Sequence, residues 1–378
     1  MTTGAPAAGL FAASTHRARL RRAAEAAAER GVDVLLITPS PDYAYLLGYS
    51  APALERLTCL VLPVEGAPVL VLPRLEEPLA RHALGGLSDD LEIVPWDETD
   101  DPIRAVQALV GPARRVAIQD QMWARFALRL GAALDPAELV PAGPTMSELR
   151  AIKDHDEIER LRAAASAADR AMLAVTAEGL SGRTEADVSR HIRDLLIAEG
   201  HDDAGFSIVA SGPNSASPHH EPGSRTISTG DAVVLDIGGT KAGYASDTSR
   251  TAFVGDPPAD FLSLFAVLRE AQAAACAAVR PGVPAAEIDA VARDIITDSG
   301  YGEAFLHRTG HGIGMETHEE PYIVASNPAP LVAGNAFSVE PGIYVRDTCG
   351  ARIEDIVVCT DAGGERLNTT STELYLVG

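Results

Sequence analysis

In the first part of the chain, apolar residues show two patterns. Short continuous runs are typical of strands, and spacings of three and four residues are typical of amphipathic helices. A helix is expected over His16–Arg30, which is rich in alanine, leucine and arginine and stops at Gly31. Strands are expected at residues 32–38, 57–62, 69–72, 91–96 and 116–119, and further helices at 76–84, 103–109 and 123–134. Alternating strands and helices are typical of an α/β domain.

Longer helices dominate the second part of the chain. Between residues 155 and 176, apolar residues recur every three or four positions, which predicts one helix with a single buried stripe. Further helices are expected over residues 184–199, 261–279 and 284–299, with acidic strand-like segments between and after them. This order of helix pair, acidic strands, second helix pair and more acidic strands hints at an internal duplication. The pattern predicts a mixed α/β (α+β) chain with two domains, residues 1–148 and 149–378.

Composition and charge narrow the functional classes. The 378 residues include 53 acidic and 31 basic side chains, and the net charge is −22. Nucleic acid and anionic membrane surfaces repel such a chain, so we expect neither as a partner. The four cysteines are scattered and form no Cys-x-x-Cys pair, which favours a reducing compartment. Residues 1–14 contain no basic residue before a short apolar patch, and no run approaches membrane-spanning length, so a cytoplasmic protein is expected.

Four carboxylates of the second domain stand in or beside strand-like segments, where β-branched residues and glycine surround them. They are Asp236, Asp247, Glu340 and Glu354. Burying them as free anions would cost several kcal/mol each in lost hydration, and bound cations would remove that cost. Together with a histidine from the run His307-Arg-Thr-Gly-His311-Gly, they form a hard, oxygen-rich ligand set. Such a set suits two divalent ions such as manganese, cobalt or zinc.

Five short motifs in the second domain resemble, in identity and in order, those of the prolidase and aminopeptidase P family. They are Asp236-Ile-Gly-Gly, Ser246-Asp247-Thr-Ser-Arg-Thr251, His307-Arg-Thr-Gly-His311-Gly-Ile-Gly, Val339-Glu340-Pro-Gly-Ile-Tyr344 and Gly350-Ala-Arg-Ile-Glu354-Asp. The resemblance covers residues 150–378 strongly and the first domain in outline. It implies a pita-bread catalytic domain that follows a creatinase/prolidase-type α/β domain.

The resemblance also implies a reaction and a ligand assignment. The expected enzyme is a binuclear metallohydrolase in which a hydroxide bridging two divalent metals attacks the peptide bond between an N-terminal residue and proline. Asp236 would chelate one ion, Asp247 and Glu354 would bridge both, and His311 with Glu340 would complete the second. Manganese is favoured, with cobalt or zinc as alternatives. Glu340 is the expected proton shuttle, because a terminal ligand keeps a free oxygen more easily than a bridging one.

Three further histidines resemble functional residues of the family. His219, in the run that ends Ser-Pro-His219-His220, would lie near the amide of the substrate, although His220 is a possible alternative. His318 resembles the histidine that stabilises the tetrahedral oxyanion, a role that needs a donor fixed where charge develops. His307 would face the cleft or serve as a structural histidine.

Arg352 lies two residues before Glu354 and so on the same face of that strand. It would either balance the charge of the carboxylates or bind the carboxylate of the substrate, which arginine does with two hydrogen bonds. Tyr244, three residues before Asp247, is a further candidate for the cleft.

The substrate expected from the resemblance is a small peptide, cleaved as by an Xaa-Pro dipeptidase, and the family resemblance also implies a homodimer. The alternatives are an aminopeptidase P that acts on longer peptides, or a relative that hydrolyses a small non-peptide C–N bond. Creatinase-type relatives do the latter without the metal ligands, and non-enzymatic binding modules on this fold lose those ligands. All five ligands are present here, which argues against both metal-free readings.

Overall fold

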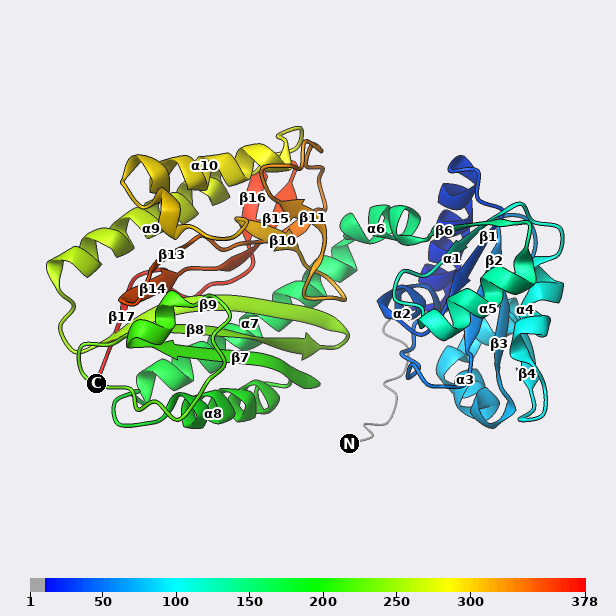
Figure 1. Ribbon diagram of the computed structural model, residues 1–378, viewed down its shortest axis with the longest axis horizontal. Coiled ribbons are helices and arrows are strands. Elements are labelled where there is room, and N and C mark those ends of the chain that lie inside the picture. Colours follow the sequence, from blue (N-terminus) through cyan, green and yellow to red (C-terminus); the bar gives the residue numbers. More distant parts are fainter. Residues whose placement is uncertain (1–10) are drawn as a thin grey trace. The chain divides into compact units, whose positions relative to one another are not determined.

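The computed structural model describes residues 11–378, so most of the 1–14 segment considered above lies outside the described residues. The chain forms two compact units, Met1–Leu149 and Arg150–Gly378, called unit 1 and unit 2 below (Figure 1). Short 3₁₀ helices occur at Arg74–Glu76, Gly85–Asp90, Gly212–Ala216 and Gly302–Ala304.

Unit 1 is built on a mixed six-stranded sheet in the order β4-β3-β2-β1-β5-β6. The strands are β1 (Val34–Ile37), β2 (Cys59–Pro63), β3 (Val69–Pro73), β4 (Glu92–Trp96), β5 (Arg115–Ile118) and β6 (Glu138–Pro141). The helices are α1 (Ala13–Glu29), α2 (Pro41–Leu47), α3 (Glu77–Leu84), α4 (Pro102–Val110), α5 (Ala124–Leu134) and α6 (Gly143–Ala151), the last crossing the limit between the units. The expected strands and helices are confirmed within a few residues at each end.

Three elements around this sheet were not expected from the sequence: α2, β6 and α6. Strand β6 is a short edge strand with no buried residue, so it carries no apolar alternation to detect. Helix α2 does carry a readable start signal, because Ser40 precedes Pro41 and its Oγ accepts a hydrogen bond from the Tyr43 N–H at 3.2 Å.

Unit 2 contains four long helices and three sheets. The helices are α7 (His155–Ala177), α8 (Glu185–Ala198), α9 (Ala259–Ala278) and α10 (Ala285–Asp298). A four-stranded sheet has the order β17-β9-β8-β7, a five-stranded sheet has the order β11-β10-β12-β15-β16, and β13 pairs with β14. Their bounds are β7 Asp203–Ser211, β8 Ala232–Lys241, β9 Tyr244–Val254, β10 Gly310–Gly312, β11 Glu319–Ile323, β12 Ala336–Val339, β13 Gly342–Val345, β14 Cys349–Arg352, β15 Asp355–Thr360, β16 Gly363–Arg366 and β17 Tyr375–Val377.

Helix α7 begins where its sequence directs. Asp154 accepts a hydrogen bond from the Glu157 N–H at 2.9 Å, and the Glu157 carboxylate accepts one from the Asp154 N–H at 3.0 Å. This reciprocal cap satisfies two N–H groups that the first turn leaves free. The predicted stripe is buried from Leu161 to Val175 and packs, with α8, against the apolar side chains of β7, β8 and β9.

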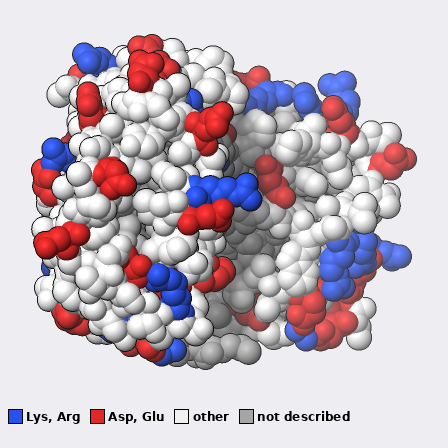
Figure 2. All heavy atoms as spheres, turned by 60° about the vertical axis from the view of Figure 1, so that its left-hand side comes forward, with Lys and Arg blue, Asp and Glu red and all other residues white. Residues whose placement is uncertain are grey.

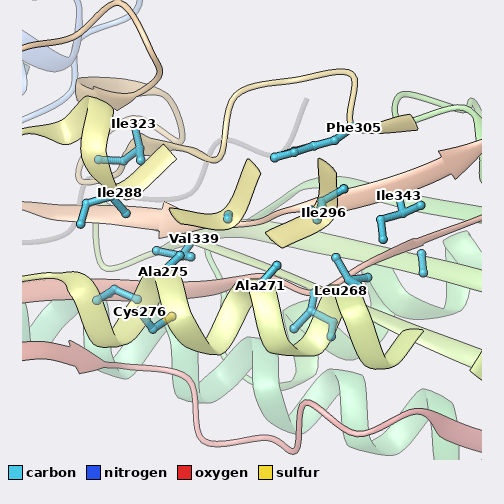
Figure 3. Packing of buried hydrophobic residues seen from close by; sticks show 14 of the residues in the cluster. Leu268, Ala271, Ala275, Cys276, Ile288, Ile296, Phe305, Ile323, Val339 and Ile343 are labelled. Atoms are coloured by element: carbon cyan, nitrogen blue, oxygen red, sulfur yellow. The ribbon is translucent and has the colours of Figure 1, made fainter. Parts of the chain in front are cut away.

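Helices α9 and α10 form the second pair and enclose a separate apolar core (Figure 3). Leu268, Ala271 and Ala275 of α9 pack in this cluster with Ile288 and Ile296 of α10 and with Val339, Ile343 and Phe305 from the strands and loops. In Figure 1 the α9–α10 pair lies on one side of the strands of unit 2 and the α7–α8 pair on the other. The strands therefore lie between two helix pairs, with a core on each side.

Helix α9 corrects one expectation from the sequence. Among the described residues, it is long and apolar enough to cross a membrane when judged by length and composition alone, so the statement that no run approaches this length was wrong. One face of α9 belongs to the core of unit 2, where Leu268, Ala271 and Ala275 are fully buried against α10 and the strands, while Arg269 and Glu270 interrupt the apolar sequence.

The two helix pairs repeat the same local structure. Thr184, before α8, forms an isolated antiparallel bridge with Thr226, and Pro284, before α10, forms one with Pro330. The backbone thus supports the internal duplication at which the sequence hinted. On the face of the molecule drawn in Figure 2, acidic and basic side chains are interspersed.

Candidate active site

The β8–β9 hairpin brings the first two carboxylates together. In its register Gly238 is opposite Asp247, and Asp236 precedes Gly238 by two residues. Because side chains two residues apart share one face of a strand, Asp236 and Asp247 lie on the same face of this sheet. A side chain at position 238 would collide with the Ser246 carbonyl and the Phe206 ring. The glycine there leaves room beside Asp236 and Asp247.

The remaining ligand candidates come from the second half of unit 2. His311 is the middle residue of β10, which is paired with β11 and β12. A Cβ at Gly310 would collide with the Ser338 carbonyl, and one at Gly312 with the backbone of Glu319 and Glu320, which explains why glycine flanks His311 on both sides. The three backbones are packed too closely there for side chains.

Backbone hydrogen bonds fix the last two acids. The Glu340 N–H donates to the Thr309 carbonyl at 2.8 Å, so the end of β12 is tied to the segment that leads into β10. The Glu354 N–H donates to the Ser249 carbonyl at 3.0 Å, which ties the β14–β15 connection to β9. Ligand candidates from both halves of unit 2 therefore converge.

The converging groups have metal-site geometry. Asp247, His311 and Glu354 are all buried, and each offers one ligand atom within 4.8 Å of the others. His311 Nε2 lies 3.2 Å from Glu340 Oε1 and 3.6 Å from Asp247 Oδ2. Its Nδ1 is 3.1 Å from the Gly312 carbonyl and donates to it in the neutral ring, which leaves the Nε2 lone pair directed at the carboxylates.

The electrostatics of the acids indicate that a cation belongs among them. Burial and the negative charge of neighbouring carboxylates raise the pKa of Asp247 and of Glu354 well above their ordinary values. Of the oxygens of these acids, Asp236 Oδ1 and Glu354 Oε1 are buried and have no hydrogen-bond partner among the described residues. Repelling carboxylates with unsatisfied oxygens are costly by themselves and are what divalent ions require. The residues present therefore fit a divalent-metal centre.

These side chains open into a pocket of about 710 Å³, within the roughly 300–1,000 Å³ range of small-molecule sites. Its lining includes nine of the residues expected from the sequence: Asp236, Asp247, His311, Glu340, Glu354, His219, His307, His318 and Arg352. Phe206, Ile208, Pro218, Arg308 and Thr317 complete it. The five in this second group were not predicted as site residues.

The two adjacent histidines point in different directions. His219 lines the pocket, whereas His220 Nε2 lies 2.8 Å from Glu185 Oε2. Glu185 is fully buried and also accepts hydrogen bonds from the Ser211 N–H at 2.8 Å and from Asn214 Nδ2 at 3.0 Å. Burial opposes ionisation, but these bonds together hold the pKa of Glu185 below its ordinary value. The Glu185 carboxylate thus fixes both the start of the loop that carries His219 and the adjacent residue, His220.

His318 is an exposed residue of the pocket lining. Its ring packs edge-on against the His311 ring, with 4.0 Å between centroids. Partial burial, with the positive charges of His311 and Arg308, lowers the pKa of His318 to about 4, so the imidazole is neutral at pH 7.

The residue after His318 holds this segment in place. Glu319 is buried, and its carboxylate pairs with Lys153 at 2.7 Å and with Arg150. Although burial raises it, the two cations keep the pKa of Glu319 below its ordinary value. The backbone of His318 is thereby tied to the start of unit 2.

Arg352 and His307 belong to one chain of hydrogen bonds. Arg352 donates to Asp236 Oδ2 at 2.7 Å and to the Tyr344 hydroxyl at 2.8 Å. The same hydroxyl is 2.9 Å from His307 Nε2, and His307 Nδ1 lies 2.7 Å from the Arg308 carbonyl. Burial lowers the pKa of His307, so the ring is neutral and accepts from Tyr344 while it donates to the carbonyl. Of the two roles open for Arg352, these contacts favour charge balance.

Tyr244 is not a cleft residue. It is fully buried, its hydroxyl lies 2.8 Å from Glu157 Oε1, and it does not line the pocket. The tyrosine that does reach the site residues is Tyr344, at the end of the Glu340-Pro-Gly-Ile-Tyr344 motif, so the signal for it was present in the sequence.

The fold and the metal centre define a metal-dependent hydrolase, and comparison with known families agrees. Residues 159–361 match the model of metallopeptidase family M24, and residues 19–152 match the creatinase/prolidase N-terminal domain. The chain belongs to metallopeptidase family M24. The resemblance deduced from the motifs and the expected fold class are confirmed, and membership implies an enzyme that uses divalent metal ions on peptide substrates.

Several relatives span the whole chain. "Probable dipeptidase PepE" of Mycobacterium tuberculosis is 46% identical over 370 residues, which cover 97% of this chain and 98% of that protein. The crystal structure of dipeptidase PepE from Mycobacterium ulcerans has a TM-score of 0.92 at 46% identity and covers 97% of this chain and 99% of that one. Prolidase from Thermococcus sibiricus has a TM-score of 0.89 at 37% identity, with coverage of 96% and 99%.

Proposed function

We propose that this protein is an Xaa-Pro dipeptidase, which hydrolyses the bond between an N-terminal residue and a C-terminal proline with the help of divalent metal ions. The observation that carries the proposal is the convergence of four carboxylates and four histidines on one pocket in unit 2. The names of the relatives, dipeptidase and prolidase, support the preference for dipeptides. Residues 149–378 would carry the catalytic machinery.

The residues that would hold two metal ions are Asp236, Asp247, His311, Glu340 and Glu354. When bound, divalent ions supply a strongly acidified water and polarise the scissile carbonyl. Manganese is the ion we favour, and cobalt or zinc would suit the same mixed oxygen and nitrogen ligands. Arg352, through its bond to Asp236 Oδ2, would orient that carboxylate and offset part of the negative charge of the acids.

We expect one side chain, Glu340, to transfer the proton during the reaction. Glu340 has 16% of its side chain exposed, against 13% for Asp236, which Arg352 already binds, and 6% for Asp247, so Glu340 would be the carboxylate that meets both the attacking water and the leaving nitrogen. It would take a proton from the water and return it to the proline nitrogen, which has no N–H of its own in the peptide. Without that transfer the leaving amine would depart as an unstable anion.

Two neutral histidines would stabilise the reacting carbonyl. His318 is uncharged at pH 7 because its pKa is lowered to about 4, so its ring N–H can donate to the oxygen as negative charge develops there. His219, held by the loop that Glu185 fixes, would donate to the substrate from the other side of the pocket.

The setting of the enzyme is also part of the proposal. The scattered, unpaired cysteines support a cytoplasmic location, and the family resemblance supports a homodimer. Light scattering on the purified protein tests the dimer: a mass of one chain at micromolar concentration contradicts it.

One assay tests the proposed reaction. Rates are measured with the manganese-loaded protein on Ala-Pro, Ala-Pro-Ala, Ala-Ala and creatine. We expect the highest kcat/KM on Ala-Pro and none on creatine. Faster cleavage of the tripeptide would identify an aminopeptidase P instead. Equal cleavage of Ala-Ala would remove the proline preference, and activity on creatine alone would overturn the peptidase assignment.

A further inference from the structure

A dipeptide brings a free carboxylate into a pocket that four acids already line. That carboxylate needs a cation, because an unpaired anion would be repelled by the acids and would lose its hydration. Two arginines line the pocket, Arg308 and Arg352. Which of them is available depends on what each already binds.

Arg352 is fully committed to the protein. Only 3% of it is exposed, and its guanidinium donates to Asp236 Oδ2, Ser249 Oγ, the Tyr344 hydroxyl and the Pro218 carbonyl. To bind a substrate carboxylate it would have to release Asp236 or break contacts on which the site depends. Arg352 thus has a structural role in the site.

Arg308 is in the opposite situation. It is half-buried and lines the same pocket, yet within residues 11–378 its guanidinium has no hydrogen bond or ion pair. Its guanidinium lies over the face of the Tyr322 ring, with the guanidinium carbon 4.4 Å from the ring centroid. Stacking of this kind fixes the plane of a guanidinium while its N–H groups remain free around the edge.

The position of Arg308 suits a group at one end of the substrate. It follows His307 directly, and its charge contributes to the lowered pKa of His318, so it lies on the histidine side of the pocket. The apolar residue Ile208 lies instead beside Asp236, its partner in the β7–β8 register. The guanidinium of Arg308, which has no ion pair in the described part of the chain, therefore lies near His307 and His318, whereas the cation beside Asp236 is the committed Arg352 and its strand neighbour is the apolar Ile208.

We propose that Arg308, stacked on Tyr322, binds the terminal carboxylate of a dipeptide and so makes this residue a determinant of peptide length. The inference rests on the proposed function and deepens it. A planar guanidinium binds a carboxylate with two parallel hydrogen bonds, which is a geometry that a longer peptide cannot satisfy with the amide at the same place.

The test compares Ala-Pro with Ala-Pro amide, which lacks the charge but has the same scissile bond. Arg308→Gln should lower kcat/KM on Ala-Pro roughly 10- to 100-fold, mainly through KM, and change the amide little, because a lost charge-assisted pair affects only the charged substrate. Arg308→Lys should recover part of the loss. Arg346→Gln is the matched control, since that arginine has 95% of its side chain exposed.

A second readout does not depend on turnover. Binding of proline, the carboxylate-bearing product, is measured by calorimetry on the wild type and on Arg308→Gln, and we expect the variant to bind roughly tenfold or more weakly. Equal losses on the acid and the amide, or unchanged Ala-Pro kinetics and proline binding in Arg308→Gln, would overturn the inference.

Failure of the proposed function has a different signature. In that case the wild type itself would not prefer Ala-Pro to Ala-Ala, whatever the variants do. The comparison of acid and amide is then made with the dipeptide that the wild type cleaves fastest, and the same outcomes decide the role of Arg308.

Discussion

The two halves of unit 2 repeat one backbone but differ in the side chains at the start of the second helix of each pair. α8 and α10 both have 14 residues, and each follows a glycine with positive φ, Gly182 at 78° and Gly282 at 88°. Matching backbone hydrogen bonds precede them: Gly182 to Ile227 and Gly282 to Leu331, then Glu185 to Arg225 and Ala285 to Ala329. The buried Glu185 of the first half therefore corresponds to Ala285 in the second.

One helical turn further along, the buried acid is in the second half of unit 2 and the uncharged residue is in the first. Ser189 of α8 donates to the Ser207 carbonyl at 2.7 Å, whereas Asp289, at the matching place in α10, accepts from the Thr309 N–H at 2.9 Å and pairs with Arg293. Glu185 thus fixes the loop that carries His219, and Asp289 fixes the segment that leads into His311. At equivalent positions of the two helices, a buried acid is therefore found where it holds a segment that carries a candidate site residue.

The largest expected effects come from removing a ligand in either half. Asp236→Asn takes one from the first half and Glu340→Gln one from the second, and each should abolish Ala-Pro hydrolysis while the protein still folds. For Glu340→Gln the loss should be at least roughly 10²–10⁴-fold in kcat, because the proton shuttle is lost as well. Steady-state kinetics and circular dichroism measure the two properties.

Asp347→Asn is the control for those variants, since 93% of its side chain is exposed. It should match the wild type in rate and in thermal unfolding. If either ligand variant kept wild-type turnover, a centre shared by both halves would be ruled out.

The next two variants distinguish the roles of the buried acids Glu185 and Asp289. Glu185→Gln replaces an acceptor oxygen with an NH₂ group that faces donors, so the His219 loop should shift and kcat should fall about tenfold, with metal affinity unchanged. Asp289→Asn should instead weaken metal binding roughly 10- to 100-fold, as expected for a group that orients the segment of a ligand. Metal titration and kcat at saturating metal are measured on both variants. The same pattern in the two would refute the contrast.

The smallest effect is expected at Ser189. Ser189→Ala removes one buried hydrogen bond, to the Ser207 carbonyl, and should lower the free energy of unfolding by about 1 kcal/mol. Neither kcat nor metal affinity should change, because β7 at Ser207 carries no ligand. Urea unfolding gives the stability, and a loss of activity in this variant would contradict the account.

Many of the helices and the ligand candidates could be predicted, because the sequence patterns that indicate them are local. Helices α7 to α10 follow apolar stripes with glycine or proline near their ends, and the ligand candidates Asp236, Asp247, His311, Glu340 and Glu354 stand in short motifs beside strands. Even the glycines around His311 have a local reason, since the neighbouring backbones leave no room for side chains.

The rest depends on contacts between segments far apart in the chain. Glu185 looks like an ordinary acid in the first turn of a helix, and only the fold shows it buried against Ser211, Asn214 and His220. Arg308 and Tyr322 are likewise brought together by the pairing of β10 and β11. Edge strand β6 lacked an apolar pattern, and α9 has the composition of a membrane helix although α10 and the strands bury one face of it.

The most direct test of the account is the metal content of the wild type. Protein stripped with a chelator and reloaded with manganese is freed of excess ion and examined by elemental analysis, in parallel with its rate on Ala-Pro. We expect about two ions per chain, as for a centre with two bridging carboxylates, and recovery of activity in step with loading. Protein that holds no divalent ion, or that cleaves Ala-Pro equally well after stripping, would contradict the account.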